Sequence, residues 1–272
     1  MTALYNGMTR EALDASYNNS AAVLNSAVLM AEFDERSAKL RAAHPQYLDL
    51  RYGPAPRNRI DYFPAARPGP LMVFIHGGYW QTRSKENFSF LTAGPLAHGL
   101  HVALVGYTLA PEQSLDGIVG EIRAALGWLA RQAPQWGTDP ERMIVSGWSA
   151  GAHLAAMVLD EPGVCGGLAI SGVYDLEPIR LSYLNDKLRL CPPDVRRLSP
   201  LHRPLSQREL VLAYGASELP ELQRQSETFA AARAGLPGEL LRLPDRNHFT
   251  ILNDLASPEG ILTQRACRLA GL

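Results

Sequence analysis

The sequence predicts a single α/β domain whose central, mainly parallel sheet is covered by helices on both faces. Apolar strand-like runs alternate with helical segments along most of the chain, which is the order of βαβ units. The run LMVFI (71–75) is continuously apolar, as expected for a strand buried on both faces. The length of 272 residues fits one such domain, and a hydrophobic fraction of 46% supplies an ordinary core.

The individual elements follow from periodicity and from turn residues. Strands are expected at 47–52, 59–63, 71–75, 101–107, 143–148, 167–175, 209–215 and 239–244. Helices are expected at 85–98 (disturbed by Pro95), 114–132, 149–159, 218–234 and 258–270. Residues 1–45 are Ala-rich and helical, and we expect an N-terminal arm that forms a partial lid. The stretch 176–208 contains five prolines, so we expect it to leave the sheet as a cap over a pocket.

Composition narrows the class of function. There are 26 basic and 27 acidic side chains, giving a net charge of −1, and no basic run suggests nucleic acid or an anionic membrane as a partner. No apolar run of about 18 residues or signal peptide is present, so we expect a cytoplasmic protein acting on a small molecule. Its three cysteines form no CxxC, which argues against a disulfide framework or a zinc site. We expect no cofactor and no metal, and a homodimer is a candidate assembly.

The pentapeptide GWSAG (147–151) is the strongest chemical signal. It lies between the apolar run MIVSGW (143–148) and the small-residue segment SAGAHLAAMVL (149–159). This is the strand–turn–helix context of a nucleophile elbow. The turn of an elbow is so tight that Gly147 and Gly151 must lack bulk, and it holds the serine hydroxyl at the positive end of the following helix. The motif therefore predicts Ser149 as the nucleophile of an α/β-hydrolase.

A second motif, HGGYW (76–80), directly follows the strand LMVFI. Acyl transfer requires hydrogen-bond donors aimed at the oxygen that becomes negative in the tetrahedral intermediate. A glycine-rich loop of this type offers backbone N–H groups at close approach. We expect the oxyanion donors to be the N–H groups of Gly78 and Tyr79 together with Ala150, the residue after the nucleophile. Gly77 is a further candidate.

A general base is also required, because a serine hydroxyl is a weak nucleophile near neutral pH. His248 follows the last predicted strand in LPDRNHF, and the chain order in this fold is Ser, acid, His. We therefore choose His248. The other histidines suit the role less well: His44 and His202 adjoin prolines, His76 braces its own loop, His153 lies on the nucleophile's helix, and His98 and His101 form a weak H-x-x-H metal pattern.

The acid of the triad is expected between Ser149 and His248, in a loop at the same edge of the sheet. Its role is to orient the imidazole and stabilise the imidazolium, which Asp and Glu can both do. Glu218 follows the penultimate strand and is our choice, because that strand is the usual supplier. Asp175, after an earlier strand, and Glu221 remain alternatives.

The motifs HGGYWQ, GWSAGAH, SGVYDLEPI, GASELPELQRQS and NHFTIL, with the early YNNS (17–20), resemble those of the kynurenine formamidases, or arylformamidases. These are relatives of the hormone-sensitive-lipase group of esterases. The resemblance implies an α/β-hydrolase with a Ser149–acid–His248 triad and an HGG oxyanion loop. It also implies hydrolysis of N-formylkynurenine or a related aryl formamide, a step of tryptophan catabolism. The family pattern has Asp where this chain has Glu218.

Aromatic residues near these motifs fit an aryl substrate. Tyr79, Trp80 and Trp148 adjoin the predicted reactive backbone, and Tyr17 and Tyr174 are further candidates for lining the pocket, although such residues often only pack the loops. Two other functions remain open. One is a small-molecule carboxylesterase with the same machinery, and the other is a non-catalytic α/β-hydrolase used as a binding module.

Overall fold

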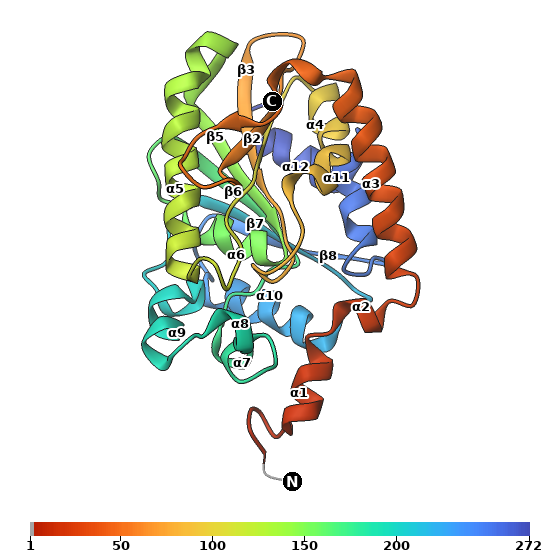
Figure 1. The fold of residues 1–272 in the computed structure, drawn as a ribbon, viewed down its shortest axis with the longest axis vertical. Helices are drawn as coiled ribbons and strands as arrows, with labels where there is room; N and C mark the ends of the chain where they lie inside the picture. The colour runs from red at the N-terminus through yellow and green to blue at the C-terminus, as the bar shows by residue number, and fades with distance from the viewer. Residues whose placement is uncertain (1–2) are drawn as a thin grey trace.

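The centre of the structure is one eight-stranded sheet, seen in a computed structural model that describes residues 3–272 (Figure 1). The strand order is β1-β2-β4-β3-β5-β6-β7-β8. Only the β1–β2 and β2–β4 pairs are antiparallel. The strands are β1 Leu50–Arg51, β2 Arg59–Phe63, β3 Gly69–Ile75, β4 His101–Val105, β5 Thr138–Trp148, β6 Val164–Ile170, β7 Glu209–Gly215 and β8 Gly238–Leu243. The predicted α/β fold with a mainly parallel sheet is confirmed.

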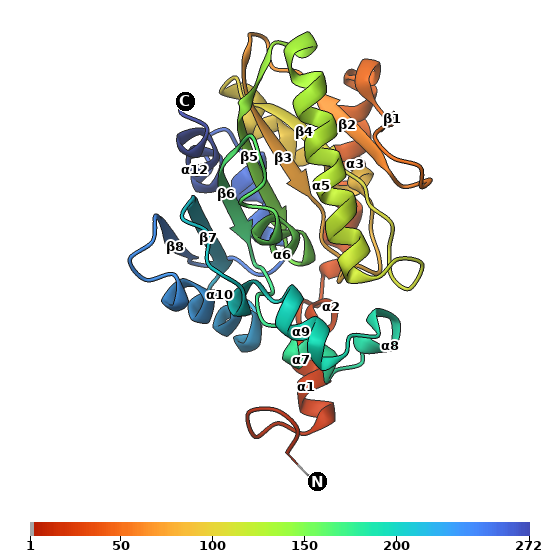
Figure 2. The same ribbon diagram turned by 90° about the vertical axis from the view of Figure 1, so that its left-hand side faces the viewer.

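Helices cover both faces of the sheet, as Figures 1 and 2 show from two sides. They include α1 Arg10–Ser16, α2 Asn19–Ala22, α3 Ser26–Ala43, α4 Ala93–Ala97, α5 Leu115–Gln132, α6 Ala150–Met157 and α10 Pro220–Ala232. The others are α7 Glu177–Arg180, α8 Asn185–Leu188, α9 Pro192–Leu198, α11 Asn253–Ala256 and α12 Ile261–Leu269. No helix within residues 3–272 is both long and apolar enough to cross a membrane.

The alternation of side chains along β3 produces two hydrophobic cores. Val73 and Ile75 face a core shared with α5, α6 and α10. Met72 and Phe74 face the second core, which includes residues of α3, α11 and α12. Since successive residues of a strand point to opposite faces, a continuously apolar strand requires cover on both sides.

Several predicted boundaries were wrong. The predicted strand 167–175 ends at Ile170, because Ser171 adopts φ 54° and turns the chain away from the sheet. The predicted strand 47–52 is reduced to Leu50–Arg51. The predicted helix 85–98 is a 3-10 helix followed by the short α4, in which Pro95 occupies the first turn, where its missing N–H breaks no helical hydrogen bond.

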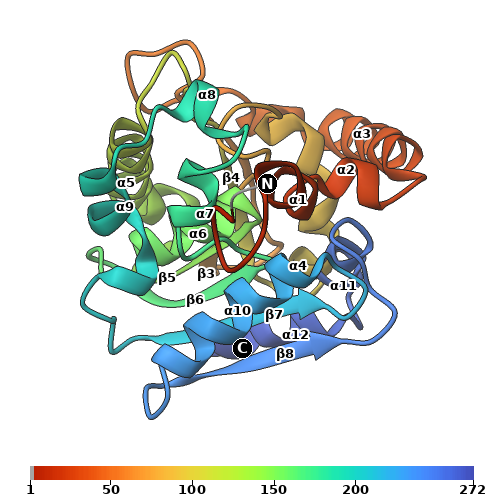
Figure 3. The ribbon, with the colours of Figure 1, turned by 90° about the horizontal axis from the view of Figure 1, so that it is seen from below.

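The part of the N-terminal arm that holds α1 and α2 lies, with the excursion at 176–208, at the edge where the parallel strands end, whereas α3 packs on one face of the sheet. Figure 3 shows this edge from below, with α1 beside α7 and near α10. The arm contains α1, α2 and α3, and its first two residues lie outside the described part of the chain. Tyr5 joins it to the loop after β6, since its hydroxyl donates to Asp175 Oδ2 at 3.1 Å. Gln81 Nε2 donates to Leu184 O at 2.8 Å and attaches the excursion to the HGGYW loop.

Candidate active site

Ser149 occupies a strained turn between β5 and α6. Its φ of 57° and ψ of −118° lie outside the regions that non-glycine residues usually adopt, which is the conformation expected of a nucleophile elbow. The flanking glycines make this turn feasible. A Cβ on Gly147 would collide with the carbonyl oxygen of Gly151, and one on Gly151 would collide with that of Ile75. Ser149 N donates to Ile170 O at 2.8 Å, which attaches the elbow to β6.

Glu218 and His248 form a buried pair at the same edge of the sheet. Glu218 Oε2 lies 2.9 Å from His248 Nδ1, and the two side chains are 0% and 3% exposed. Oε1 of the same carboxylate accepts hydrogen bonds from Ser171 Oγ and from Gly215 N, both at 2.6 Å. A carboxylate held by three donors orients the imidazole and presents its other nitrogen, Nε2, for proton transfer.

Backbone hydrogen bonds connect the loops that carry this pair. Ala216 N donates to Leu243 O and Ser217 N donates to Arg246 O, each at 2.9 Å. The chain around His248 is held further by Trp148, whose Nε1 donates to His248 O at 2.7 Å. The residue before the nucleophile therefore also holds the backbone of the predicted base.

The alternative acids have other partners. Asp175 accepts from the Tyr5 hydroxyl and from Glu177 N, and its Oδ1 lies 3.4 Å from His202 Nε2. Glu221 pairs with Arg224 at 2.8 Å. Neither contacts His248 among the contacts of residues 3–272, whereas Glu218 does.

The HGGYW loop lies directly beside the elbow. A Cβ on Gly77 would come within 3.0 Å of Ser149 Cβ and 2.7 Å of Trp148 O. Gly78 has φ 111° and Tyr79 φ 50°, and the N–H groups of both donate to no acceptor within the described residues. Ala150 is the first residue of α6, so its N–H has no intrahelical partner. Gly77 therefore lies against the predicted nucleophile, and the free N–H groups belong to the residues that follow Gly77 and Ser149 in the chain.

His76, the first residue of this loop, stabilises its start. Its Nδ1 lies 2.8 Å from Gly77 O, and Tyr107 donates its hydroxyl to His76 O at 3.0 Å. Burial lowers the pKa of His76 to about 4, so its imidazole is neutral at physiological pH.

Most of the aromatic residues predicted to line a pocket are buried. Trp80, Tyr17 and Tyr174 have no exposed surface, and Trp148 is 3% exposed. The Tyr174 ring stacks on Phe229 and the Trp80 ring contacts His153 edge-on. Tyr79 is only partly buried. A substrate-binding role for these residues stays a prediction, and the burial of the first four favours packing.

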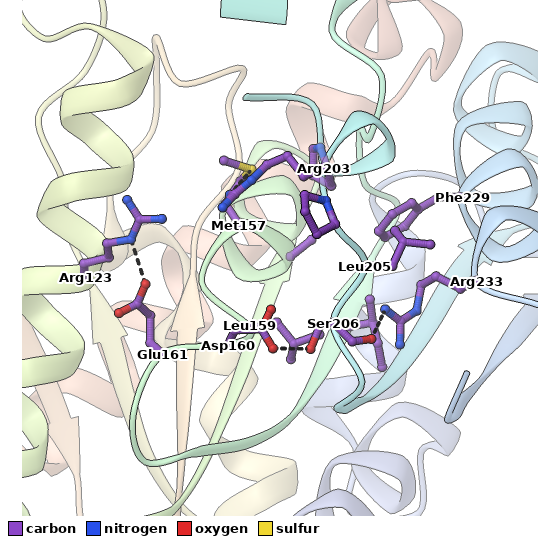
Figure 4. Close-up of a pocket in the computed structure, with 14 residues that line it drawn as sticks. Arg123, Met157, Leu159, Asp160, Glu161, Arg203, Leu205, Ser206, Phe229 and Arg233 are labelled. Carbon is purple, nitrogen blue, oxygen red and sulfur yellow. Dashed lines mark hydrogen bonds and ion pairs between the residues drawn. The ribbon is translucent and has the colours of Figure 1, made fainter. Parts of the chain in front are cut away.

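One cavity, shown in Figure 4, lies away from this site. Arg123 and Arg233 are among its lining residues, together with Met157 from the end of α6. None of the residues predicted to be catalytic lines it.

Ser171, which contacts the buried carboxylate of Glu218, was not among the predicted site residues. A usable signal was present, because Ser171 directly follows an apolar run, and the carboxyl ends of neighbouring parallel strands meet at one edge. The predicted strand 167–175 included Ser171, whereas β6 ends at Ile170. The predicted boundary therefore placed Ser171 within a strand and not among the site residues.

The fold and the site define an α/β-hydrolase that acts on amide or ester bonds, and comparisons with known proteins agree. The esterase LipW from Mycobacterium marinum shares the fold, with a TM-score of 0.72 over 93% of this chain and 90% of its own at 20% identity. A crystal structure from Silicibacter sp. TM1040 covers 93% of this chain and 97% of its own, at 26% identity and a TM-score of 0.84. The family model BD-FAE matches residues 62–160.

Relatives that match over most of the chain identify the family more narrowly. The kynurenine formamidase of Danio rerio is 31% identical over 253 residues, which cover 86% of this chain and 85% of the relative. That of Salmo salar is also 31% identical, over 87% and 86%. The chain belongs to the kynurenine formamidase family.

Proposed function

We propose that the protein hydrolyses small aryl formamides of the N-formylkynurenine type, with Ser149 as nucleophile, His248 as general base and Glu218 as the orienting acid. The observation that carries this proposal is the buried contact of 2.9 Å between Glu218 Oε2 and His248 Nδ1, at the same edge of the sheet as the strained Ser149. The similarity to kynurenine formamidases from Danio rerio and Salmo salar supports the choice of substrate.

The reaction proceeds in two halves. Ser149 Oγ attacks the formyl carbon while His248 Nε2 takes the hydroxyl proton, and the carbonyl oxygen becomes an oxyanion. When the C–N bond breaks, the same proton passes to the departing aryl amine, leaving a formyl ester on Ser149. Water then attacks this ester with His248 again as base, and formate leaves as Ser149 regains its proton.

In this proposal the N–H groups of Gly78, Tyr79 and Ala150, which have no other acceptor in the described residues, receive the oxyanion. Backbone donors of this kind act mainly in the transition state, and the loss of one costs about 3–4 kcal/mol in measured cases. Because the donors are fixed by the elbow and by the HGGYW loop, little reorganisation is required when charge develops on the oxygen.

A small-molecule carboxylesterase is the second candidate. Its support is the similarity to an isoprenylcysteine alpha-carbonyl methylesterase of Arabidopsis thaliana, which is 34% identical over 113 residues, or 40% of this chain and 26% of that protein. An ester and a formamide both react through a tetrahedral intermediate, so the acyl group and the leaving group distinguish the two activities.

Steady-state kinetics decide between the candidates. We expect kcat/KM to be higher for N-formylkynurenine and formanilide than for p-nitrophenyl acetate corrected for its more reactive leaving group. Ser149→Ala protein, purified in parallel, measures contaminating activity. Preference for the acetyl ester after that correction favours the carboxylesterase. The highest kcat/KM on a C10 p-nitrophenyl ester would contradict both and indicate a long acyl channel.

We also propose a cytoplasmic location. The cysteines Cys165, Cys191 and Cys267 are free thiols, as is usual for proteins in a reducing compartment. Cell fractionation with a tagged chain tests this location, and recovery outside the cytoplasmic fraction would contradict it.

A further inference from the structure

The side chain of Tyr79 attaches the HGGYW loop to the N-terminal arm. Its hydroxyl donates to the backbone oxygen of Tyr17 at 2.7 Å and accepts from Asn19 Nδ2 at 3.0 Å. These partners lie about sixty residues earlier in the chain, where α1 ends and α2 begins. Burial raises the pKa of Tyr79 well above its ordinary value, so the hydroxyl stays protonated and can donate.

The arm is attached in turn to the side of the site that carries the acid. The Tyr17 hydroxyl accepts from Gln225 Nε2 at 3.0 Å and donates to Glu221 Oε2 at 3.3 Å. Gln225 Oε1 accepts from Tyr174 N and Asp175 N, both at 2.8 Å, in the loop that follows Ser171. Tyr17 therefore connects the HGGYW loop with the loop after β6 and with α10.

The backbone of the HGGYW loop requires such support. Tyr79 and Trp80 have φ values of 50° and 60°, in the left-handed region that non-glycine residues rarely adopt. Residues held in this region persist only where their surroundings over-determine the conformation. Gly78 before them adopts φ 111°, and its carbonyl oxygen accepts from Gln81 N and Thr82 N at 3.0 Å. These local bonds do not hold the Tyr79 ring, whereas the arm does.

We propose that Asn19 and Tyr17 are positioning residues for the oxyanion hole, acting through the hydroxyl of Tyr79. They hold the Tyr79 side chain so that the backbone N–H groups of Gly78 and Tyr79 keep the geometry that receives the developing oxyanion. The N-terminal arm is then part of the catalytic apparatus as well as a cover. This inference rests on the hydrolase activity proposed above.

Loss of this attachment has a specific kinetic consequence. Donors to an oxyanion bind the transition state more strongly than the ground state, so misplacing them lowers kcat and leaves KM nearly unchanged. Complete loss of one donor lowers kcat by about 10²–10³-fold. A displaced donor retains part of its effect, so we expect a fall of about 10–100-fold.

The chain offers a matched control for each variant. The Tyr52 hydroxyl donates to Gly106 O at 2.7 Å and accepts from Asn58 Nδ2 at 3.2 Å, the same pattern as at Tyr79. Tyr52→Phe thus removes the same pair of hydrogen bonds at a tyrosine outside the HGGYW loop, and Asn58→Ala removes one of them together with the bond from Ala55 N to Asn58 Oδ1 at 3.0 Å. The test variants are Tyr79→Phe, which keeps the ring and the backbone N–H, and Asn19→Ala.

For all four variants, the experiment measures kcat and KM with formanilide as substrate and Ki for an arylboronic acid. The urea concentration at the midpoint of unfolding is measured for each variant as well. We expect Tyr79→Phe and Asn19→Ala to lose about 10–100-fold in kcat with KM within about twofold, and to bind the boronic acid, which forms a tetrahedral adduct, about tenfold less tightly. The control variants should stay within about twofold of wild type in kcat at a comparable loss of stability.

Three outcomes would overturn the inference. The first is no loss of kcat in any of the four variants, the second is a rise in KM alone, and the third is an equal loss of kcat in all four variants. Asn19→Ala keeps the test decisive if Tyr79→Phe does not fold. Wild-type protein inactive on formamides and esters would instead refute the proposed function, and the boronic acid Ki then still reports on the oxyanion hole.

Discussion

Ser171 Oγ donates a hydrogen bond of 2.6 Å to Oε1 of Glu218, on the opposite side of the carboxylate from His248. Ser171 is fully buried and adopts φ 54° directly after β6. Glutamate is one carbon longer than the aspartate implied for this position, and its Oε1 returns to the backbone N–H of Gly215, three residues earlier. Two donors besides His248, Ser171 Oγ and Gly215 N, therefore hold the glutamate carboxylate against the imidazole.

Ser171→Ala should lower kcat by about tenfold, because a hydrogen bond to a charged group is worth about 1.5–3 kcal/mol. Part of that energy holds Glu218 in the orientation that His248 requires. The control is Ser226→Ala, which removes a buried hydroxyl that has no hydrogen-bond partner in the described structure. Equal kcat values for the two variants would show that Ser171 only fills space.

Glu218→Gln should lower kcat by about two to four orders of magnitude, since a neutral amide neither stabilises the imidazolium nor fixes its tautomer. Asp175→Asn should cost clearly less, because Asp175 contacts Tyr5, Glu177 and His202 instead of His248. Steady-state kinetics on formanilide compare the two. A larger loss for Asp175→Asn would move the acid to the loop after β6.

Features encoded by adjacent residues could be predicted from the sequence. GWSAG predicts the turn at Ser149 because the two glycines, the strand and the helix that form this turn are neighbours of Ser149 in the sequence. LMVFI predicts β3 because the residues on both of its faces are apolar. Contacts between distant segments could not be predicted in this way. The bond from Tyr79 to Tyr17 joins residues 62 positions apart, and no periodicity reports it.

The acid shows the same limit. Glu218, Asp175 and Glu221 all follow predicted strands or begin a helix, so their local context does not separate them. They are separated by tertiary packing, which brings the loops after β7 and β8 together through the bond from Ser217 N to Arg246 O. The end of β6 was misjudged because Gly172 and Val173 continue its small and apolar composition, while Ser171 already leaves the sheet.

Ser149→Ala should abolish turnover and leave the free energy of unfolding nearly unchanged. Its hydroxyl makes no hydrogen bond to the described residues that the fold would lose, and Ala retains the Cβ beside Gly77. By analogy with measured triads, kcat should fall by up to about 10⁶-fold. A fluorophosphonate probe should label wild type and spare the variant, and equal labelling of both would refute Ser149 as the nucleophile.

The stability of the fold should fall as pH decreases from 7 to 5. Burial lowers the pKa values of His76 and His153 to about 4, from an ordinary value of 6.5. The unfolded chain therefore binds more protons than the folded one between pH 6.5 and 4, so this stability is present above pH 6.5 and is lost on acidification. The loss is about 2 kcal/mol per histidine between pH 7 and 5.

His153 lies outside the proposed machinery, with Nε2 2.8 Å from Leu198 O. His153→Gln should therefore reduce the difference in unfolding free energy between the two pH values, measured by urea unfolding, by about 2 kcal/mol. Tyr52→Phe destabilises the fold without removing a group that titrates in this range, because burial raises the pKa of Tyr52 further above its ordinary value of 10.0, and should retain the full difference. An unchanged difference in His153→Gln would show that the buried imidazole is not the source of the acid sensitivity.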